Sequence, residues 1–368
     1  MSDHETFMTL ALKEARRGQG RTRPNPMVGC VVVKDGEVIA KGYHARAGED
    51  HAEVVALRRA GEAAKGADVY VTLEPCNHHG RTPPCTTSLI EAGVARVFVG
   101  FRDPNELVDG RGIRKLRRAG IQVETGILKE QCRVLNESFN HFIGSKRPFM
   151  IAKIAQSMDG RVATRTGESK WITGAKARKF GHQLRHECDG IMVGIGTVLA
   201  DDPSLTCRGV RGGVDPVRII VDSQARTPLK SKVLKVNRDS DAPTWIFVDK
   251  KADDSKVQAL EKAGAEVIRV RSKAGRLSLN AILDELGKRD LLSVLVEGGP
   301  SLMGSLFDGG FISKVHAFVA PMVIGGEQAT PSVGGQGVRS LADACRLTDL
   351  KLERLGSDVL LTGYSKGS

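Results

Sequence analysis

The sequence predicts an α/β protein made of two domains in tandem. Its 368 residues exceed the size of one ordinary compact domain, which is about 150 residues. Short β-branched segments alternate with segments of helical periodicity along the chain, and this alternation is typical of layered α/β folds. A polar, turn-rich segment at residues 144–148 interrupts the alternation. We therefore expect one domain over residues 1–146 and a second over residues 147–368.

The first half begins with a helix and a hairpin. Phe7, Leu10, Ala11 and Ala15 share one face at helical spacing, which predicts a helix over residues 5–18. An Asp-Gly turn signal then lies between two apolar runs, so we expect a hairpin with strands at 28–33 and 38–40. The further elements expected in this half are helices over 51–61, 85–92, 112–119 and 129–142, and strands over 68–73, 95–99 and 121–125.

The second half repeats the alternation with longer β-branched runs. We expect strands over 149–155, 189–193, 217–221, 244–248, 266–270 and 293–296. Helical periodicity predicts helices over 175–186, 257–264 and 279–288. The glycine-rich stretch 333–337 is interpreted as a surface loop.

Composition excludes several classes of protein. No run of 18 apolar residues is present, which argues against a membrane span, and the N-terminus lacks the apolar core of a signal peptide. We therefore expect a cytoplasmic protein. Seven cysteines, an odd number, make a disulfide framework improbable. Five of them show no metal-ligand spacing and are expected to be buried or inert thiols: Cys30, Cys132, Cys188, Cys207 and Cys345.

The charge of the chain points to small anionic ligands rather than to nucleic acid. The formal net charge of +12 is spread along the chain without a basic tail. Aromatic residues make up only 4% of the sequence, too few for a base-stacking platform. We expect a small-molecule substrate and no nucleic-acid or membrane partner.

The strongest chemical signal is a set of metal-ligand residues in the first half. His51 begins a predicted helix, Cys76 follows a predicted strand, and Cys85 opens another helix. A catalytic zinc site needs three such ligands and one open position. The positive ends of nearby helices favour the thiolate, which is the form that binds metal. Pro75 and Pro84 help to fix the chain that enters each cysteine. Glu53, two residues after His51, could take a proton from the zinc-bound water and pass it to a leaving amine.

Two alternatives stay open for these residues. His78 or His79 could complete a four-ligand structural zinc site with His51, Cys76 and Cys85, although such a site would not need Glu53. His44 is interpreted either as a core or turn histidine or as a pocket residue, because it follows the hairpin that carries Asn25 toward the same end. A His-x-Glu followed by Pro-Cys and Cys is the signature of zinc-dependent base deaminases. The spacing departs from that signature, since residues 77–84 separate the two cysteines.

Three segments of the first half closely resemble the deaminase domain of the RibD family, the bifunctional deaminase–reductases of riboflavin biosynthesis. They are PNPMVGCVVV (24–33), GYHARAGEDHAEVVAL (42–57) and VTLEPCNHHGRTPPC (71–85), and the long cysteine spacing is also a RibD feature. The resemblance implies a cytidine-deaminase-like three-layer α/β/α fold. It also implies zinc-dependent hydrolytic removal of the 2-amino group of 2,5-diamino-6-(5-phosphoribosylamino)pyrimidin-4-one. The implied residues are His51, Cys76 and Cys85 for zinc, Glu53 for proton transfer, and Asn25, His44 and His78 for the substrate.

Two glycine-containing strand-to-helix turns stand out in the second half. They lie at residues 194–197 and 298–301, where backbone amides could approach a pyrophosphate without side-chain obstruction. Neither turn is a complete dinucleotide fingerprint, and such turns are more often structural than ligand-binding. Trp171, taken alone, is more often a core residue than a wall of a cofactor site.

Residues 148–365 as a whole resemble the reductase domain of the same family. The resemblance is carried by segments 152–161, 168–173, 193–203, 221–223 and 296–302. It implies a dihydrofolate-reductase-like α/β fold that binds NADPH and reduces a ribosyl group to a ribityl group. The implied cofactor residues are Ala155, Trp171, Thr197, Asp201, Ser223 and a loop formed by Gly299, Pro300, Ser301, Leu302, Met303, Gly304 and Ser305. The preference for NADPH over NADH rests on the resemblance.

The same resemblance maps a second group of residues to the phosphorylated substrate. Arg185 and Arg208 are suited to form charge-assisted forks with a 5′-phosphate. Glu297 could bind sugar hydroxyls or steer a proton, with Lys153 as its partner. The remaining members of the group are Ser169 and Leu205.

Competing functions were weighed against the bifunctional enzyme. A nucleic-acid-editing deaminase would explain the positive charge and the zinc motif, but the scarce aromatic residues argue against it. A degenerate deaminase domain acting as a scaffold is disfavoured because all three ligands and Glu53 are present. We also expect the chain to form a homo-oligomer.

Overall fold

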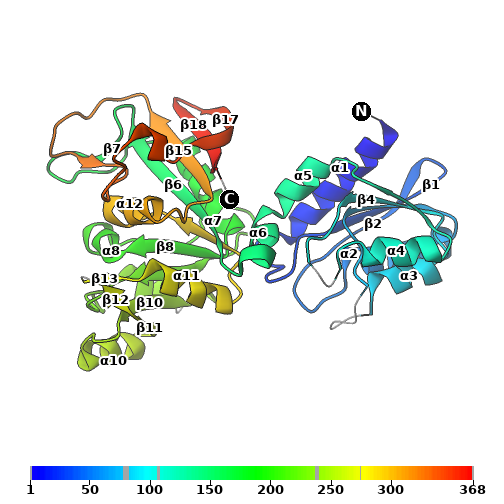
Figure 1. The fold of residues 1–368 in the computed structure, drawn as a ribbon, viewed down its shortest axis with the longest axis horizontal. Coiled ribbons are helices and arrows are strands. Elements are labelled where there is room, and N and C mark those ends of the chain that lie inside the picture. Colours follow the sequence, from blue (N-terminus) through cyan, green and yellow to red (C-terminus); the bar gives the residue numbers. More distant parts are fainter. Residues whose placement is uncertain (1, 78–82, 106–107, 237–239, 274, 367–368) are drawn as a thin grey trace. The chain divides into compact units, whose positions relative to one another are not determined.

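The computed structural model describes residues 2–77, 83–105, 108–236, 240–273 and 275–366. The chain divides into two compact units, Met1–Lys146 and Arg147–Ser368, each with its own sheet (Figure 1).

The first unit is built on a five-stranded sheet in the order β2-β1-β3-β4-β5. Strand β1 runs antiparallel to both neighbours, whereas β3, β4 and β5 run parallel. The hairpin turn between β1 and β2 places Asp35 and Gly36 at φ of 51° and 82°, the left-handed region that the Asp-Gly signal predicts. The strands are β1 Gly29–Lys34, β2 Glu37–Tyr43, β3 Asp68–Leu73, β4 Arg96–Phe101 and β5 Gln122–Thr125.

Helices cover both faces of this sheet, giving three layers. Alternate residues of β1 enter different cores, because successive side chains of a strand point to opposite faces. Cys30 and Val32 pack with one set of helices, and Val31 and Val33 pack with the other. The first set is α2 Ala52–Ala60, α3 Cys85–Glu91 and α4 Arg111–Arg118, and the second is α1 Asp3–Ala15 and α5 Lys129–Leu135. Short 3₁₀ turns follow two of these helices, η1 Arg16–Gly18 and η2 Gly61–Ala64.

The single helix expected over 129–142 is wrong. Two helices occupy this region, α5 and α6 (Glu137–Ser145), and Asn136 between them has φ −114° and ψ 27°. The Asn136 carboxamide is buried and binds the backbone of Met27 through both of its polar atoms. This long-range contact fixes the Asn136 side chain at the break between the helices.

The second unit contains a nine-stranded sheet in the order β11-β10-β9-β8-β14-β6-β15-β18-β17. The strands from β11 to β15 run parallel to one another, and β18 and β17 complete one edge in antiparallel pairing. The strands are β6 Phe149–Ser157, β8 Gly190–Gly194, β9 Val217–Val221, β10 Thr244–Asp249, β11 Glu266–Val270, β14 Ser293–Val296, β15 Lys314–Ala320, β17 Leu347–Leu355 and β18 Asp358–Ser365. Two small pairs lie outside it: β7 Arg161–Ala163 with β16 Thr330–Pro331, and β12 Ser272–Lys273 with β13 Arg276–Leu277.

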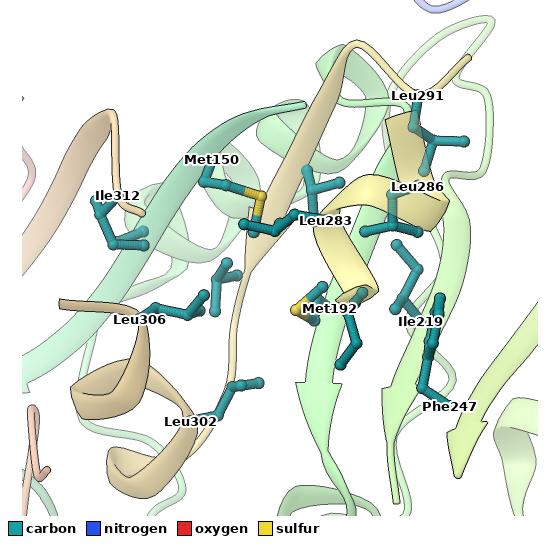
Figure 2. Packing of buried hydrophobic residues seen from close by; sticks show 14 of the residues in the cluster. Met150, Met192, Ile219, Phe247, Leu283, Leu286, Leu291, Leu302, Leu306 and Ile312 are labelled. Atoms are coloured by element: carbon teal, nitrogen blue, oxygen red, sulfur yellow. The ribbon is translucent and has the colours of Figure 1, made fainter. Parts of the chain in front are cut away.

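One face of this sheet carries a continuous hydrophobic core. Met192, Ile219 and Phe247 from the strands meet Leu286 and Leu306 from α11 and α12 (Figure 2). The opposite face divides into two smaller clusters, one with α7 and one with α8, α9 and α10. The helices are α7 Ala175–Glu187, α8 Ile195–Asp201, α9 Lys232–Lys235, α10 Asp254–Lys262, α11 Leu279–Lys288 and α12 Pro300–Asp308, with a 3₁₀ turn η4 at Leu341–Asp343.

The order of the strands creates a switch point between β8 and β14. After β8 the chain continues outward to β9, whereas after β14 it continues to β15 on the other side. In open parallel sheets, ligands bind outside the carboxyl ends of the strands at such a point. Gly194 ends β8 and Glu297 follows β14, so both lie at the edge where a ligand is expected.

The unpaired cysteines differ in burial. Cys30, Cys132 and Cys188 are buried, whereas Cys207 is half-buried and Cys345 is exposed. Cys345 lies in the long connection between β16 and β17, outside both sheets. Among the described residues, no helix combines the length and the apolar character needed to span a bilayer.

Candidate functional site

The three predicted metal ligands converge in the first unit. His51 caps the start of α2, Cys76 lies just beyond β3, and Cys85 is the first residue of α3. His51 Nδ1 lies 3.1 Å from Cys85 Sγ and 3.5 Å from Cys76 Sγ. A tetrahedral zinc ion with ordinary bond lengths separates its nitrogen and sulfur ligands by about 3.5 Å. The donor set and its spacing therefore fit zinc.

The two cysteines differ in their affinity for a proton. Hydrogen bonds from Cys85 and His51 lower the pKa of Cys76 to about 4, which outweighs the opposing effect of burial. The backbone N–H of Cys85 also donates to Cys76 Sγ, at 3.3 Å. The Cys85 thiol has a raised pKa, because it donates to Cys76 and is buried. Cys76 is therefore held as a thiolate, which is the form that binds metal.

Glu53 lies beside this cluster in the first turn of α2. Its side chain is buried, with only 3% of the residue exposed. Burial and the nearby Cys76 raise the pKa of Glu53 to about 7. A carboxyl group in such a place is suited to accept and return a proton.

A cavity of about 360 Å³ opens onto Glu53 and the cluster. The described residues that line it are Pro24, Asn25, Pro26, Val28, His44, Ala47, Gly48, Glu49, His51, Glu53, Leu73, Glu74, Cys76, Asp103, Asn105, Val108 and Phe139. The set brings together Asn25 and His44, two of the residues predicted to hold the substrate. His78, the third, lies outside the described residues, as does His79, so the four-ligand alternative is not tested.

The histidine and the asparagine of the cavity are connected to each other. His44 is 2% exposed, and its Nδ1 lies 3.2 Å from the carbonyl oxygen of Asp50. Because a carbonyl can only accept, Nδ1 carries the proton and Nε2 is left to accept from Asn25 Nδ2, at 3.1 Å. His44 is thus both a buried histidine and a pocket residue, in a neutral form with a pKa lowered by burial.

Several cavity residues carried no signal in the sequence. Glu74 accepts hydrogen bonds from the backbone N–H groups of Gly110, Gly112 and Ile113, at 3.0, 3.1 and 3.2 Å, and so anchors the start of α4 beside Pro75-Cys76. Burial raises the pKa of Asp103 to about 6. Only the position of Glu74, directly before the Pro-Cys motif, could have singled it out.

A half-buried charge cluster lies at the switch point of the second unit. Arg185 of α7 donates to both carboxylate oxygens of Glu297, from Nε at 2.7 Å and from Nη2 at 2.9 Å. Lys153 Nζ of β6 lies 3.5 Å from the same carboxylate. Burial alone would raise the pKa of Glu297, but the charges of Arg185 and Lys153 lower it to about 2. The expected pairing of Lys153 with Glu297 is present.

The guanidinium of Arg185 engages Glu297, and its Nη1 donates to the carbonyl of Thr206 at 3.0 Å. The expected contact of Arg185 with a 5′-phosphate stays a prediction. Arg208 is exposed, and its guanidinium donates to Thr206 Oγ1 at 2.9 Å.

The two glycine turns lie side by side at the same edge. Gly194 and Gly299 are the N-caps of α8 and α12, and neither cap uses a side-chain hydrogen bond. A Cβ at Gly299 would lie 3.7 Å from Thr197 Oγ1 in the first turn of α8. The two N-termini thus leave backbone amides and a hydroxyl near one another, an arrangement suited to a pyrophosphate.

The loop expected over 299–305 is wrong, because these residues form the start of α12. Pro300 occupies its first turn, where the missing N–H costs nothing. Leu302 and Met303 point into the hydrophobic core, and Gly304 packs directly on the backbone of Gly334 in the glycine-rich loop. The side chains of Leu302 and Met303 therefore face the core, whereas Ser301 is exposed and Ser305 is half-buried. The expected contacts of residues 299–305 with the cofactor stay a prediction.

The remaining predicted residues are scattered around the same unit. Trp171 is 69% exposed, with Arg178 stacked over its ring at 4.6 Å, so it is not a core residue. Leu205 is 2% exposed and its side chain packs in the core, while its expected contact with the substrate stays a prediction. The other four are half-buried: Ala155 on β6, Ser169 before α7, Asp201 at the end of α8 and Ser223 after β9.

Comparison with known families matches both units. The model for the cytidine and deoxycytidylate deaminase zinc-binding region matches residues 1–101. The model for the RibD C-terminal domain matches residues 148–361.

Full-length relatives show the same pairing of units. Riboflavin biosynthesis protein RibD of Actinobacillus pleuropneumoniae is 44% identical over 96% of this chain and 93% of its own length. The protein of the same name from Aquifex aeolicus is 44% identical over 97% of each chain. Among solved structures, Acinetobacter baumannii RibD superposes with a TM-score of 0.88 at 36% identity, covering 99% of both chains. A Thermotoga maritima diaminohydroxyphosphoribosylaminopyrimidine deaminase/5-amino-6-(5-phosphoribosylamino)uracil reductase gives 0.87 at 36% identity, with the same coverage.

Fold and site together define a zinc-dependent deaminase joined to an NADPH-dependent reductase. The chain belongs to the RibD family and is a bifunctional enzyme of riboflavin biosynthesis. The expected fold class, the two enzyme activities and the two cofactors are confirmed.

Proposed function

We propose that residues 1–146 form the deaminase domain and residues 147–368 the reductase domain of this enzyme. In the first, 2,5-diamino-6-(5-phosphoribosylamino)pyrimidin-4-one and water give 5-amino-6-(5-phosphoribosylamino)uracil and ammonia. In the second, NADPH reduces the ribosyl group of that product to a ribityl group. The observation that carries the proposal is the buried Glu53 beside a three-ligand cluster at the end of a cavity.

The deamination uses residues from both sides of the cavity. Zinc held by His51, Cys76 and Cys85 would supply a Lewis acid that activates water near neutral pH. Glu53 takes the proton from the attacking water and delivers it to the leaving amine. Asn25 at the cavity wall holds the pyrimidine, and neutral His44 orients Asn25 by accepting from its Nδ2.

The reduction takes place at the carboxyl edge of the second sheet. The N-termini of α8 and α12 would hold the pyrophosphate of NADPH, whose nicotinamide would supply the hydride. Lys153 and Glu297 face the sugar, where the ammonium group donates to a sugar oxygen and the carboxylate accepts from a hydroxyl. Arg208 pairs with the 5′-phosphate, since its guanidinium is exposed beside this cluster.

The variant Glu53→Gln tests the deaminase assignment. Glutamine keeps the shape of the side chain but cannot carry the proton, so ammonia release should fall by about 10²- to 10⁴-fold. NADPH oxidation on supplied 5-amino-6-(5-phosphoribosylamino)uracil should be unchanged, and zinc content should stay at that of the wild type. Full ammonia release by the variant would show that the proposed mechanism is wrong.

We also propose that the chain assembles as a homo-oligomer through β17 and β18. Strand β17 ends the nine-stranded sheet, and nearly all of its residues are exposed. Leu350 and Leu352 on β17 are 64% and 69% exposed, and Leu361 of β18 pairs directly with Leu352. Exposed apolar side chains on an edge strand favour pairing with another chain.

A further inference from the structure

Asn136 occupies the joint between α5 and α6, and its side chain reaches a segment far away in the sequence. Its Oδ1 accepts from the backbone N–H of Met27 at 2.8 Å, and its Nδ2 donates to the carbonyl of Met27 at 2.9 Å, across 109 residues. Asn136 is 3% exposed, so water does not compete for these two bonds. The carboxamide satisfies both polar groups of Met27, as a neighbouring strand would.

The segment that Asn136 holds forms one wall of the deaminase cavity. Pro24, Asn25, Pro26 and Val28 line the cavity around Met27 and precede β1, outside any helix or strand. Backbone bonds hold the two ends of this segment, from Asn25 N–H to the Thr22 carbonyl and from His44 N–H to the Val28 carbonyl. The two bonds from Asn136 hold Met27 between them, and side-chain bonds of this kind fix the path of a segment outside the sheet. The clamp at Met27 therefore contributes to the position of Asn25, which in turn donates to His44 Nε2.

The same joint brings a second wall into place. Phe139, in the first turn of α6, also lines the cavity. The break at Asn136 changes the course of the chain just before Phe139, and the backbone carbonyl of Asn136 accepts from Asn140 as α6 begins. Asn136 and Phe139 both lie beyond residue 101, where the match to the general deaminase zinc-binding region ends. The joint thus adds cavity walls to a zinc centre that many deaminases share.

We propose that Asn136 is a positioning residue for substrate binding in the deaminase domain. It acts through Met27 and Asn25, and it touches neither the zinc ligands nor Glu53, which stand on α2, β3 and α3. The inference rests on the proposed deaminase function. In this inference Asn136 positions the wall of the cavity and takes no direct part in the chemistry at the metal.

The test compares Asn136→Asp and Asn136→Ser with the wild-type enzyme, in the full chain. Aspartate keeps the acceptor for the Met27 N–H but sets an oxygen against the Met27 carbonyl, and serine is too short to reach both groups. We expect KM for the diaminopyrimidine substrate in ammonia release to rise about 10- to 100-fold, with kcat changed less than about threefold. Zinc content and NADPH oxidation on the deaminated intermediate should equal those of the wild type.

Asn140→Ala is the matched control. The Asn140 amide donates to the carbonyl of Arg133 at 3.1 Å, within the same pair of helices, and makes no bond to residues 24–28. We expect its KM to stay within about twofold of the wild type.

Two results would overturn the inference. An unchanged KM in both Asn136 variants would show that the clamp does not position the wall. If both variants lost their zinc and also lost the ability to release ammonia, Asn136 would instead be assigned to the stability of the fold. If the wild-type enzyme itself released no ammonia from this substrate, the proposed function would fail, which is a different outcome.

Discussion

For Glu297, the sequence predicted one of the two basic partners of its carboxylate but not the other. The sequence analysis placed it beside Lys153, and the structure confirms that pair. It also adds Arg185, whose guanidinium donates to both oxygens of the carboxylate. Arg185 and Glu297 are 112 residues apart, and no local sequence pattern connects them. The sequence therefore indicated two charged residues without indicating that they form an ion pair.

Replacing Glu297 by Gln should destabilise the reductase domain by about 3 kcal/mol, because Arg185 and Lys153 would lose their anionic partner. The stabilisation by Glu297 should be fully present above its ordinary pKa of 4.5 and be lost as the pH falls toward the folded value of about 2. The difference in the free energy of unfolding between the wild type and Glu297→Gln should therefore be constant from pH 7 to about 5. Below that pH the difference should become smaller.

Urea unfolding followed by tryptophan fluorescence can measure this difference. Both tryptophans, Trp171 and Trp245, lie in residues 147–368, so the signal reports the reductase domain. A difference that stayed constant down to pH 3 would contradict the assigned charge coupling.

At the scale of the element, α12 shows why residues 299–305 were expected to form a loop although they begin a helix. Gly298-Gly299-Pro300 looks like a loop in sequence, yet the proline stands in the first turn of a helix and the glycine caps it. The helix then buries Met303 and presses Gly304 against the loop at Gly334. Glycine at 304 is required by this close backbone packing.

The variant Gly304→Ala should be costly. Its Cβ would lie 2.2 Å from the carbonyl carbon and oxygen of Gly334, so the loop or α12 must move. We expect a loss of about 2 kcal/mol in the stability of the reductase domain and a lower rate of NADPH oxidation, with ammonia release unchanged. Gly181→Ala in α7 is the control, because its Cβ would meet only Lys153 Cε at 3.8 Å and should not destabilise the helix. Equal stability of the two variants would contradict the packing argument.

Elements were predictable where local pattern and burial agree. The buried runs of β3, β9, β11 and α11 match their predicted limits, because β-branched or helical periodicity is strong there. Strand β17 was missed because its exposed sequence LTDLKLERL mixes leucines with charges. The zinc ligands and Glu53 were predictable from spacing, whereas Glu74, Phe139 and Asn136 act through contacts that no local pattern contains.

At the scale of the whole molecule, the proposed homo-oligomer depends on the edge formed by β17 and β18. Changing Leu350 and Leu352 to Ser should remove the apolar surface and convert an oligomer into single chains, as measured by sedimentation velocity. Leu341→Ser is the control, since Leu341 is 84% exposed but lies in η4, outside the sheet. A wild-type protein that already sediments as a single chain would refute the proposed oligomer.

Helix α6 restricts how these two enzymes can be recombined with others. It carries Phe139 to the deaminase cavity and ends at Ser145, and β6 of the reductase begins at Phe149. A recombination point placed after β5 would keep the complete first sheet and every zinc ligand in one fragment. It would nevertheless place Phe139, which lines the cavity, in the other fragment. Only a junction near residues 146–148 would allow the deaminase domain or the reductase domain to be exchanged intact.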